Sequence, residues 1–493
     1  MFRPISNTCS YPVIILIMVA FIGISWMVSM HHFLLAVPLL FLFALASAWL
    51  IIRLDAMPVY FKVLAFLLPF SIPVPFFAGH MVRIPAEPML GLAVIMLPFF
   101  LLKEKHNHAG ILYKEFAFAI PLVAVYIATS FFSDMLLVSL KFSFVNIVYI
   151  LVFYVLLVHL YKKQPGLFRD MVILYGMGFL LVSLWSLYQF WQYDWEPLVM
   201  RGIFQPFYND HTIFGASAAI LTVLAIGMPG GSNLPAWRAI RFLPVLFFLM
   251  LVFYSTSRGA MLSLAVSLFV AIFLLIRPRP IYTMALLFVL TLGIYAVYPS
   301  VSERIQHIET LSYERDAGVV DRTRSVANIT TDVSNVERLN RWVSAWRMFQ
   351  ERPLTGFGPG TYQFVYIPYQ EERLMNRLTV TNPWDPPEGS GGTAHSEYLL
   401  LLSETGLFGL AAFLLLMGRW TWLTLHSWRF HPSRRHMFTA LVALSTYFFH
   451  ALVNNFLTTD KFAFLFWGTA AYLVASYHNV KETNETSHTN CRR

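Results

Sequence analysis

Three residues that can exchange protons stand close together near position 400 of this 493-residue chain. His395 and Glu397 lie in the stretch GGTAHSEYLLLLSETGLFG, and a second carboxylate, Glu404, follows inside the apolar run. An imidazole can take a proton from a hydroxyl group near neutral pH. The two acids are about two helical turns apart, so they share one face of any helix that this run forms. The stretch therefore predicts a polar site where an apolar helix begins.

Two arginines stand beside apolar runs elsewhere in the chain. Arg258 lies in YSTSRGAML, and Arg201 lies in MRGIFQPFYNDHTIFG. An arginine at membrane level is costly unless it reaches the interface or meets an anion. In the second stretch, Asn209 or Asp210 is expected to cap a helix that begins near His211.

Each of these residues also has a structural interpretation. Arg201 and Arg258 could bind ordinary lipid phosphates at the membrane interface. His395 could be a loop histidine near a helix start, and Glu404 could pair with an arginine to hold two helices together. The sequence alone leaves these alternatives open.

The elements that position these residues must be membrane helices. The chain is 57% hydrophobic and 12% charged, with a mean hydropathy of +0.61, whereas about a quarter of a soluble domain is charged. The apolar residues form blocks long enough to cross a bilayer, which predicts an all-α polytopic membrane protein with about 12–14 transmembrane helices. The candidate spans are residues 11–30, 33–52, 59–77, 86–102, 115–133, 143–161, 170–190, 212–228, 240–255, 260–276, 281–298, 397–423, 436–453 and 461–477.

The first and third expected spans differ from ordinary membrane helices. The first is long, lacks a small-residue cleavage site and is followed at once by a second, so we interpret it as a retained span and not as a signal peptide. The third contains Pro69, Pro73 and Pro75, which predicts a kinked or partly re-entrant segment.

The positive charges predict the orientation of the chain. Alternate short loops carry 19 Lys and Arg on one side and 5 on the other. The positive-inside rule then places both termini in the cytoplasm. The net charge of +9 is therefore explained by topology, and no nucleic-acid partner is expected. Cys9 and Cys491, the only cysteines, are expected to be free cytoplasmic thiols.

This topology divides the chain into four parts. Residues 1–298 are expected to form transmembrane helices 1–11, residues 299–396 a large outer loop with amphipathic helices, residues 397–478 the C-terminal transmembrane helices, and residues 479–493 a cytoplasmic tail. The outer loop contains ten arginines and no lysine, and arginine is the better bidentate partner of phosphate.

Within the outer loop, two helices and a turn are expected. The stronger helix, residues 336–350, has an apolar stripe of Val336, Leu339, Val343 and Trp346. Arg341 points away from this stripe, which is typical of a solvated face. A weaker helix is expected at residues 301–312, and GFGPG at residues 356–360 predicts a tight turn.

Arg201, Arg258 and the His395 segment all fall on the outer side of this topology. That agreement predicts an outward-facing cleft at membrane level that suits a lipid-linked anion. We find no metal-binding pattern, phosphate-binding loop or dinucleotide fingerprint, and expect no metal and no cofactor.

The motifs in this region resemble those of a known family. RLNRWVSAWRMFQERPLTGFGPGTY followed by AHSEYLLLLSETGLFGL, with STSRGAML upstream, is similar to the signature of the O-antigen ligase and polymerase superfamily. These proteins are glycosyltransferases of the bacterial inner membrane with a large periplasmic loop. The likeness covers roughly residues 195–425, and the order of the motifs also matches.

The resemblance implies a metal-independent reaction. A glycan is transferred from undecaprenyl diphosphate to an acceptor hydroxyl, with inversion at the anomeric carbon. The implied catalytic residues are Arg258 and Arg341, which would stabilise the diphosphate, and His395, which would activate the acceptor. The implied substrate-binding residues are Arg201, Arg338, Glu397 and Glu404, and either acid could fix the His395 tautomer or hold an arginine.

The acceptor stays open among members of the superfamily. Ligases use lipid A-core, polymerases use a second lipid-linked glycan, and protein O-oligosaccharyltransferases use Ser or Thr. A flippase and a chain-length regulator are possible partners of a polymerase. A small-anion transporter is the alternative from another class, but the absence of a convincing internal repeat favours an enzyme.

Overall fold

The computed structural model describes residues 33–75, 81–104, 109–195, 202–227, 242–276, 333–387, 392–427 and 434–490, together with Leu292. The expected spans 11–30 and 281–298, Leu292 apart, lie outside these residues, as do Arg201 and the expected helix at residues 301–312. The described helices are α2 (Phe33–Arg53), α3 (Met57–Leu67), α4 (Ala86–Glu104), α5 (Ala109–Phe131), α6 (Leu136–Tyr149), α7 (Leu157–Lys163), α8 (Leu167–Gln192), α9 (His211–Gly227), α11 (Leu243–Tyr254), α12 (Arg258–Ile276), α15 (Val333–Glu351), α16 (Tyr362–Val365), α17 (Glu397–Ser427), α18 (Arg434–His450) and α19 (Asp460–Asn490), with the short helices η1 (Leu68–Phe70), η3 (Ile150–Leu156), η6 (Ile367–Tyr369) and η7 (Glu372–Leu374).

The helices confirm an all-α polytopic membrane protein. Five of those described are long and apolar enough to cross a bilayer, and five shorter apolar helices accompany them. The five long ones cover Ala86–Lys103, Leu136–Lys163, Leu167–Gln192, Arg258–Ile276 and Glu397–His426, and each overlaps an expected span. At the C-terminal end, α19 continues to Asn490, so most of the expected tail is helical.

The proline-rich third segment does not form one continuous helix. Helix α3 passes into η1, which ends at Phe70, and the chain then forms strand β1 (Ile72–Pro75). This strand pairs antiparallel with β2 (Met81–Ile84), with Ile72 opposite Ile84. Two prolines in β1 remove donors that a continuing helix would need. The expected interruption is therefore present, but as a short hairpin that replaces the end of the span.

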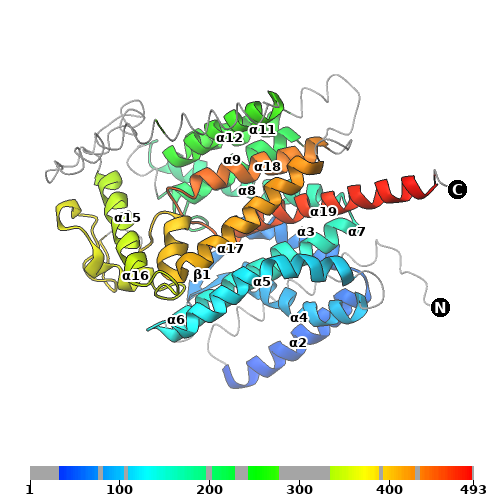
Figure 1. Ribbon diagram of the computed structural model, residues 1–493, viewed down its shortest axis with the longest axis horizontal. Coiled ribbons are helices and arrows are strands. Elements are labelled where there is room, and N and C mark those ends of the chain that lie inside the picture. The colour runs from blue at the N-terminus through cyan, green and yellow to red at the C-terminus, as the bar shows by residue number, and fades with distance from the viewer. Residues whose placement is uncertain are drawn as a thin grey trace.

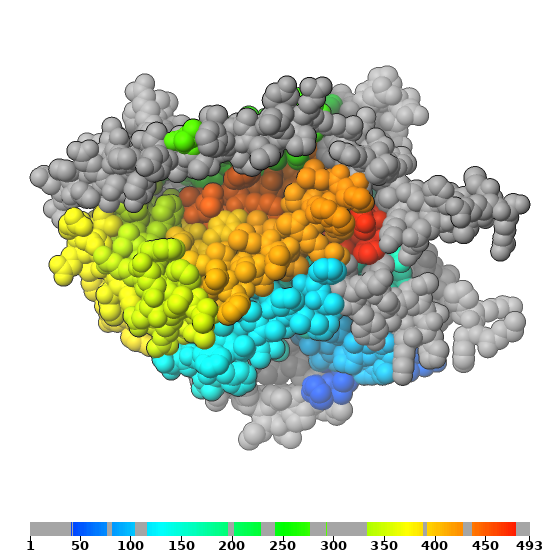
Figure 2. Space-filling model, in the orientation of Figure 1, coloured from blue at the N-terminus to red at the C-terminus, as the bar shows by residue number. Residues whose placement is uncertain are grey.

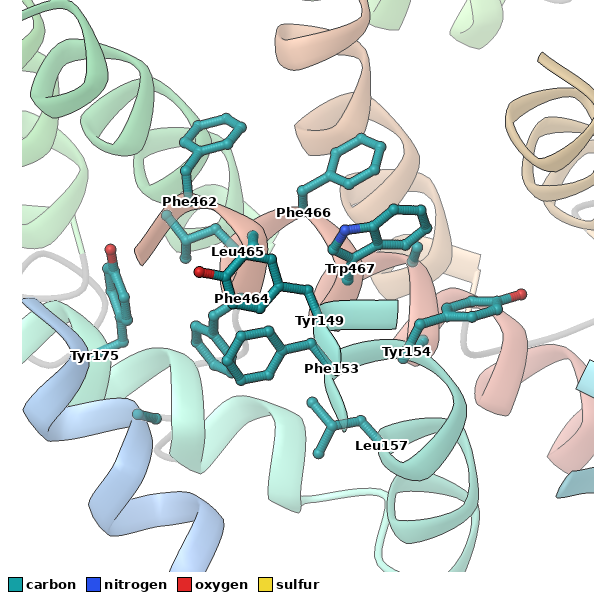
Figure 3. Packing of buried hydrophobic residues seen from close by; sticks show 14 of the residues in the cluster. Tyr149, Phe153, Tyr154, Leu157, Tyr175, Phe462, Phe464, Leu465, Phe466 and Trp467 are labelled. Atoms are coloured by element: carbon teal, nitrogen blue, oxygen red, sulfur yellow. The ribbon is translucent and has the colours of Figure 1, made fainter. Parts of the chain in front are cut away.

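The centre of the bundle is aromatic. Helices α6 and α7 are joined without a break by the π-helical turn η3, which packs against α19. Figure 3 shows Tyr149, Phe153 and Tyr154 from this segment lying against Phe464 and its neighbours in α19. The Phe153 and Phe464 rings meet edge to face, with centroids 5.5 Å apart, a favourable geometry for aromatic pairs.

The described part of the outer loop packs at one end of this bundle. Helices α15 and α16 lie beside the start of α17 (Figure 1), and residues of this region form one continuous end of the molecule next to α17 and α6 (Figure 2). Arg352 Nη2 lies 2.9 Å from Asp134 Oδ2 in the turn between α5 and α6. At Gly358, where φ is +105°, a Cβ atom would lie 2.3 Å from Ser133 Cβ. The loop is thereby fixed to the turn between α5 and α6.

Candidate active site

The His395 segment is held by the helix that precedes it in the outer loop. His395 has φ +47°, a left-handed conformation that is uncommon outside glycine and enriched in Asn, Asp and His. Two residues of α15 support it: the Trp342 Nε1–H donates to the His395 carbonyl oxygen at 3.2 Å, and Arg341 Nη1–H donates to the Thr393 carbonyl oxygen at 3.1 Å. The structure therefore fixes the backbone that presents the His395 ring.

The His395 ring is neutral at pH 7. Its pKa is lowered from the usual value to about 3. Burial of the ring is the largest cause, and the positive charges of Arg341 and Arg338 act in the same direction because they disfavour the imidazolium. The Asp210 carboxylate acts in the opposite direction. A neutral imidazole has a lone pair that can accept a proton, but in the free protein this low pKa makes the ring a weaker base than the sequence predicted.

Arg341 lies on the buried side of α15. Its side chain is 1% exposed, its Nε–H donates to Glu337 Oε1 at 2.8 Å, and Glu337 Oε2 accepts from the Thr379 hydroxyl at 2.9 Å. The expected apolar stripe describes the buried face only in part, because Val336 is buried but Trp346 is 49% exposed. The buried face also includes Glu337, Arg341 and Ala345, and a polar pair can occupy it because its hydrogen bonds are made within the loop.

Arg338 also acts on the site. It lies one turn before Arg341 on α15, is partly buried, and its charge lowers the pKa of His395. This places a second guanidinium within electrostatic range of the imidazole. Arg338 and Arg341 differ in their surroundings, since Arg341 is almost fully enclosed and Arg338 is not.

Arg258 is brought near the site by close helix packing. It is the first residue of α12. At Gly259, a Cβ atom would lie 2.9 Å from His450 Nε2 at the end of α18, so glycine is required for α12 and α18 to approach this closely. The adjacent turn is also tight, because a Cβ at Gly215 in α9 would lie 2.4 Å from Ser255 Oγ. The starts of α9 and α12 therefore meet the end of α18.

Asp210 caps α9, as one of the two alternatives predicted. Its Oδ1 accepts from the Thr212 backbone N–H at 2.8 Å, and its Oδ2 accepts from the Thr212 hydroxyl at 2.6 Å. Burial alone would raise the pKa of Asp210, but its hydrogen bonds to His211 and Thr212 outweigh burial and hold that pKa well below the usual range. Asp210 is thus a fixed negative charge on the α9 side of His395.

The two glutamates have different partners, and neither is hydrogen-bonded to His395. Glu397 Oε2 accepts from the Tyr447 hydroxyl at 2.5 Å, and the Glu397 N–H donates to the Ala451 carbonyl oxygen at 2.9 Å. Glu404 Oε1 accepts from the Tyr362 backbone N–H at 3.0 Å. Glu397 therefore links α17 to the end of α18, and Glu404 links α17 to the start of α16. The ring of His395 has Asn454 as its partner instead, with Nδ1 3.4 Å from Asn454 Oδ1.

The GFGPG turn forms as predicted and docks on a kink in α17. Gly356, Gly358 and Gly360 all have positive φ. The Phe357 N–H donates to the Ser403 carbonyl oxygen at 3.0 Å, and the Gly358 N–H to the Glu404 carbonyl oxygen at 2.8 Å. Gly406 interrupts the helix there, with φ +67° and ψ −166°. These contacts lock the outer loop onto α17 two turns beyond His395.

The segment that carries these residues matches a known protein family. Residues 243–414 match the family model described as O-antigen ligase. The resemblance to the O-antigen ligase and polymerase superfamily is confirmed. No curated protein matches the chain significantly. The O-antigen ligase match contains Arg258, Arg338, Arg341 and His395, and it ends within α17. It supports activity of the glycosyltransferase type in general.

Two residues outside the O-antigen ligase match complete the surroundings of His395. His450 is the last residue of α18, and Asn454 lies in the loop that follows. Neither residue was identified from the sequence. The available signal was weak: three polar residues in HALVNN, at the end of an expected span. The described residues contain no group of three or more His, Cys, Asp or Glu side chains arranged to hold a metal ion.

We expect Gly406→Ala to destabilise the O-antigen ligase region. Its backbone conformation is essentially restricted to glycine, which predicts a loss of about 1–3 kcal/mol in the free energy of unfolding. A Cβ there would also lie 2.3 Å from the Leu354 carbonyl oxygen. The matched control is Gly418→Ala in the same helix, where a Cβ meets nothing within 4 Å. Thermal unfolding in detergent should show a lower midpoint for Gly406→Ala only; equal midpoints would contradict the assigned kink.

Proposed function

We propose that the protein is a glycosyltransferase that moves a glycan from undecaprenyl diphosphate to an acceptor hydroxyl at the periplasmic face of the bacterial inner membrane. The observation that carries this proposal is the position of His395 in the O-antigen ligase segment: it lies within electrostatic range of Arg338 and Arg341, and Asn454 links it to His450, against which α12 begins. A base beside several cations suits a reaction in which a hydroxyl loses a proton while an anion leaves.

In the proposed step, the acceptor oxygen attacks the anomeric carbon of the donor sugar. The bond between that carbon and the diphosphate oxygen breaks, and the configuration at the carbon is inverted. The acceptor proton passes to His395, whose pKa in the free protein leaves the ring unprotonated at neutral pH. Binding of the donor diphosphate adds negative charge nearby, which stabilises the imidazolium as it forms.

The leaving diphosphate needs positive charge, because its negative charge grows in the transition state. We assign this role to Arg258 and Arg338, with Arg201 as an additional ligand. Arg341 was expected to share the role, but its Nε and Nη1 groups are already bound to Glu337 and to the Thr393 carbonyl oxygen. We therefore propose that Arg341 mainly positions the His395 segment.

The membrane setting supports a lipid-linked donor. His395 and Arg258 stand at the starts of α17 and α12, where a headgroup at the bilayer surface can reach them. The charge distribution of the loops favours the outer face for this end. Lipid A-core and a second lipid-linked glycan are the acceptors proposed first. A flippase that delivers the donor and a chain-length regulator would then be partners.

Transfer by the purified protein tests this proposal. The protein would be mixed with a fluorescent polyprenyl-diphosphate-linked oligosaccharide and, separately, with lipid A-core, a second lipid-linked glycan or a serine-containing peptide. We expect a new glycoside and free polyprenyl diphosphate with at least one acceptor, and an unchanged rate with EDTA, since arginines take the place of a metal in the proposed site. Failure with all three acceptors, in a preparation that binds the donor, would contradict the proposal; loss with EDTA would contradict its metal-independent form.

A further inference from the structure

A short polar chain extends from His395 to the end of α18, where it meets the start of α12. It consists of Asn454, in the loop between α18 and α19, and His450, the last residue of α18. Asn454 is 3% exposed and His450 is 1% exposed. Burying two polar side chains is unfavourable unless their hydrogen bonds are made. Their arrangement therefore needs an explanation beyond packing.

The hydrogen-bond geometry orders the three side chains. Asn454 Oδ1 lies 3.4 Å from His395 Nδ1, and Asn454 Nδ2 lies 2.9 Å from His450 Nε2. A carbonyl oxygen can only accept, so His395 Nδ1 carries the proton that this contact uses. The amide N–H donates to His450 Nε2. The nitrogen of His395 left with a lone pair is then Nε2.

The orientation of the amide is fixed by His450. Within the described residues, the Nδ1 atom of His450 is buried without a hydrogen-bond partner, so Asn454 is the polar contact that this ring makes there. The ring itself is confined, because it packs against Gly259 and meets the Phe456 ring with centroids 5.0 Å apart. A rigid acceptor of this kind can select one of the two orientations of the amide.

The loop that carries Asn454 is anchored to the start of α17. The Ala451 carbonyl oxygen accepts from the Glu397 N–H at 2.9 Å, and the Tyr447 hydroxyl that donates to Glu397 also accepts from the Phe456 N–H at 3.0 Å. Contacts on both sides of Asn454 therefore fix its distance from His395. Glu397 acts on His395 indirectly, through the position of this loop.

We propose that Asn454, oriented by His450, is a positioning residue that holds His395 with its Nε2 lone pair directed to the acceptor hydroxyl. This inference rests on the proposed function, since it assigns His395 as the base of glycan transfer. It extends the site to two residues beyond the O-antigen ligase match. It also gives a reason for the buried amide and imidazole at the end of α18.

Asn454→Ala is expected to lower kcat for glycan transfer by about 10- to 100-fold, as loss of an orienting partner commonly does. The KM for the donor should stay near that of the wild type, because the role assigned to Asn454 is to hold His395 and not to bind the diphosphate. The decisive comparison adds Asn454→Ala to His395→Asn. If Asn454 acts through His395, the double variant should be no slower than His395→Asn alone. A further loss in the double variant would overturn the inference in favour of a general structural role.

Asn454→Asp provides a second readout if the alanine variant is unstable. A carboxylate still accepts from His395 Nδ1–H, so much of the kcat should be retained. The groups acting on His395 are Arg338 and Arg341 of α15, Asp210 before α9 and residue 454 itself. A new negative charge at residue 454 favours the imidazolium. In the pH profile of kcat/KM, the acid limb should therefore move to higher pH. An acid limb at the wild-type pH would overturn the inference.

The control variant is Asn455→Ala, which removes the neighbouring, partly buried amide on the same loop. It should transfer glycan at the wild-type rate. If Asn454→Ala showed wild-type kinetics while His395→Asn was inactive, the role of Asn454 would be overturned and the role of His395 would stand. An inactive wild-type protein that binds the donor would instead contradict the proposed function, so the two failures are distinguishable.

Discussion

His395→Asn is expected to slow glycan transfer by about 100- to 10,000-fold, the range typical of losing a general base. Asparagine is the informative replacement because residue 395 has φ +47°, and asparagine adopts this left-handed conformation more easily than alanine. The backbone contacts from Trp342 and Arg341 should then survive. The effect should appear in kcat, since the imidazole is assigned to the proton transfer and not to donor binding.

The measurement is single-turnover transfer from a lipid-diphosphate-linked glycan by the purified variant. The control is His426→Ala, which removes an exposed histidine from the last turn of the same helix. It should leave the rate unchanged. A His395→Asn protein that is folded and transfers glycan at the wild-type rate would remove His395 from the mechanism.

Sequence reasoning was most successful where one physical rule decides the outcome. The hydropathy blocks predicted the apolar helices, and helix-cap chemistry predicted that Asp210 or its neighbour starts α9. The glycines of residues 356–360 predicted a turn that requires positive φ. Each of these features depends on neighbouring residues, so a local rule is sufficient.

The same reasoning failed where distant segments decide what is buried. Arg341 was expected on a solvated face, but Glu337 and Arg341 are buried with partners that lie 42 and 52 positions further along the chain, at Thr379 and Thr393. A periodicity rule cannot include such partners. The result reverses the simple interpretation of Arg341 as a solvated residue.

The glutamates show a related limit. Their spacing predicted a shared face of α17, yet one contacts Tyr447 and the other contacts the N–H of Tyr362. Asn454 was missed for the same reason, since it meets His395 only after α17 and α18 have packed. Helical spacing predicts which residues are near each other on one helix. It does not predict their hydrogen-bond partners, because these lie on other elements.

Arg258→Ala is expected to reduce kcat for glycan transfer by about 100- to 1,000-fold, the cost commonly measured when one group that stabilises transition-state charge is removed. Arg258 begins α12 beside Gly259, and the contact of Gly259 with His450 fixes this helix end near the polar chain of His395. Arg258→Lys should be intermediate. Lysine keeps the positive charge but cannot form the bidentate contact that a guanidinium makes with phosphate oxygens.

The matched control is Arg373→Ala. Arg373 is an arginine of the outer loop whose side chain is 63% exposed and whose Nε is 2.9 Å from Glu371 Oε1, an exposed pair of the kind that contributes little to stability. This variant should transfer at the wild-type rate. If the same loss of rate followed removal of either arginine, the effect would reflect general positive charge and not a site at Arg258. Loss of transfer in Arg258→Ala alone, with intermediate activity in Arg258→Lys, would assign the guanidinium to the leaving diphosphate.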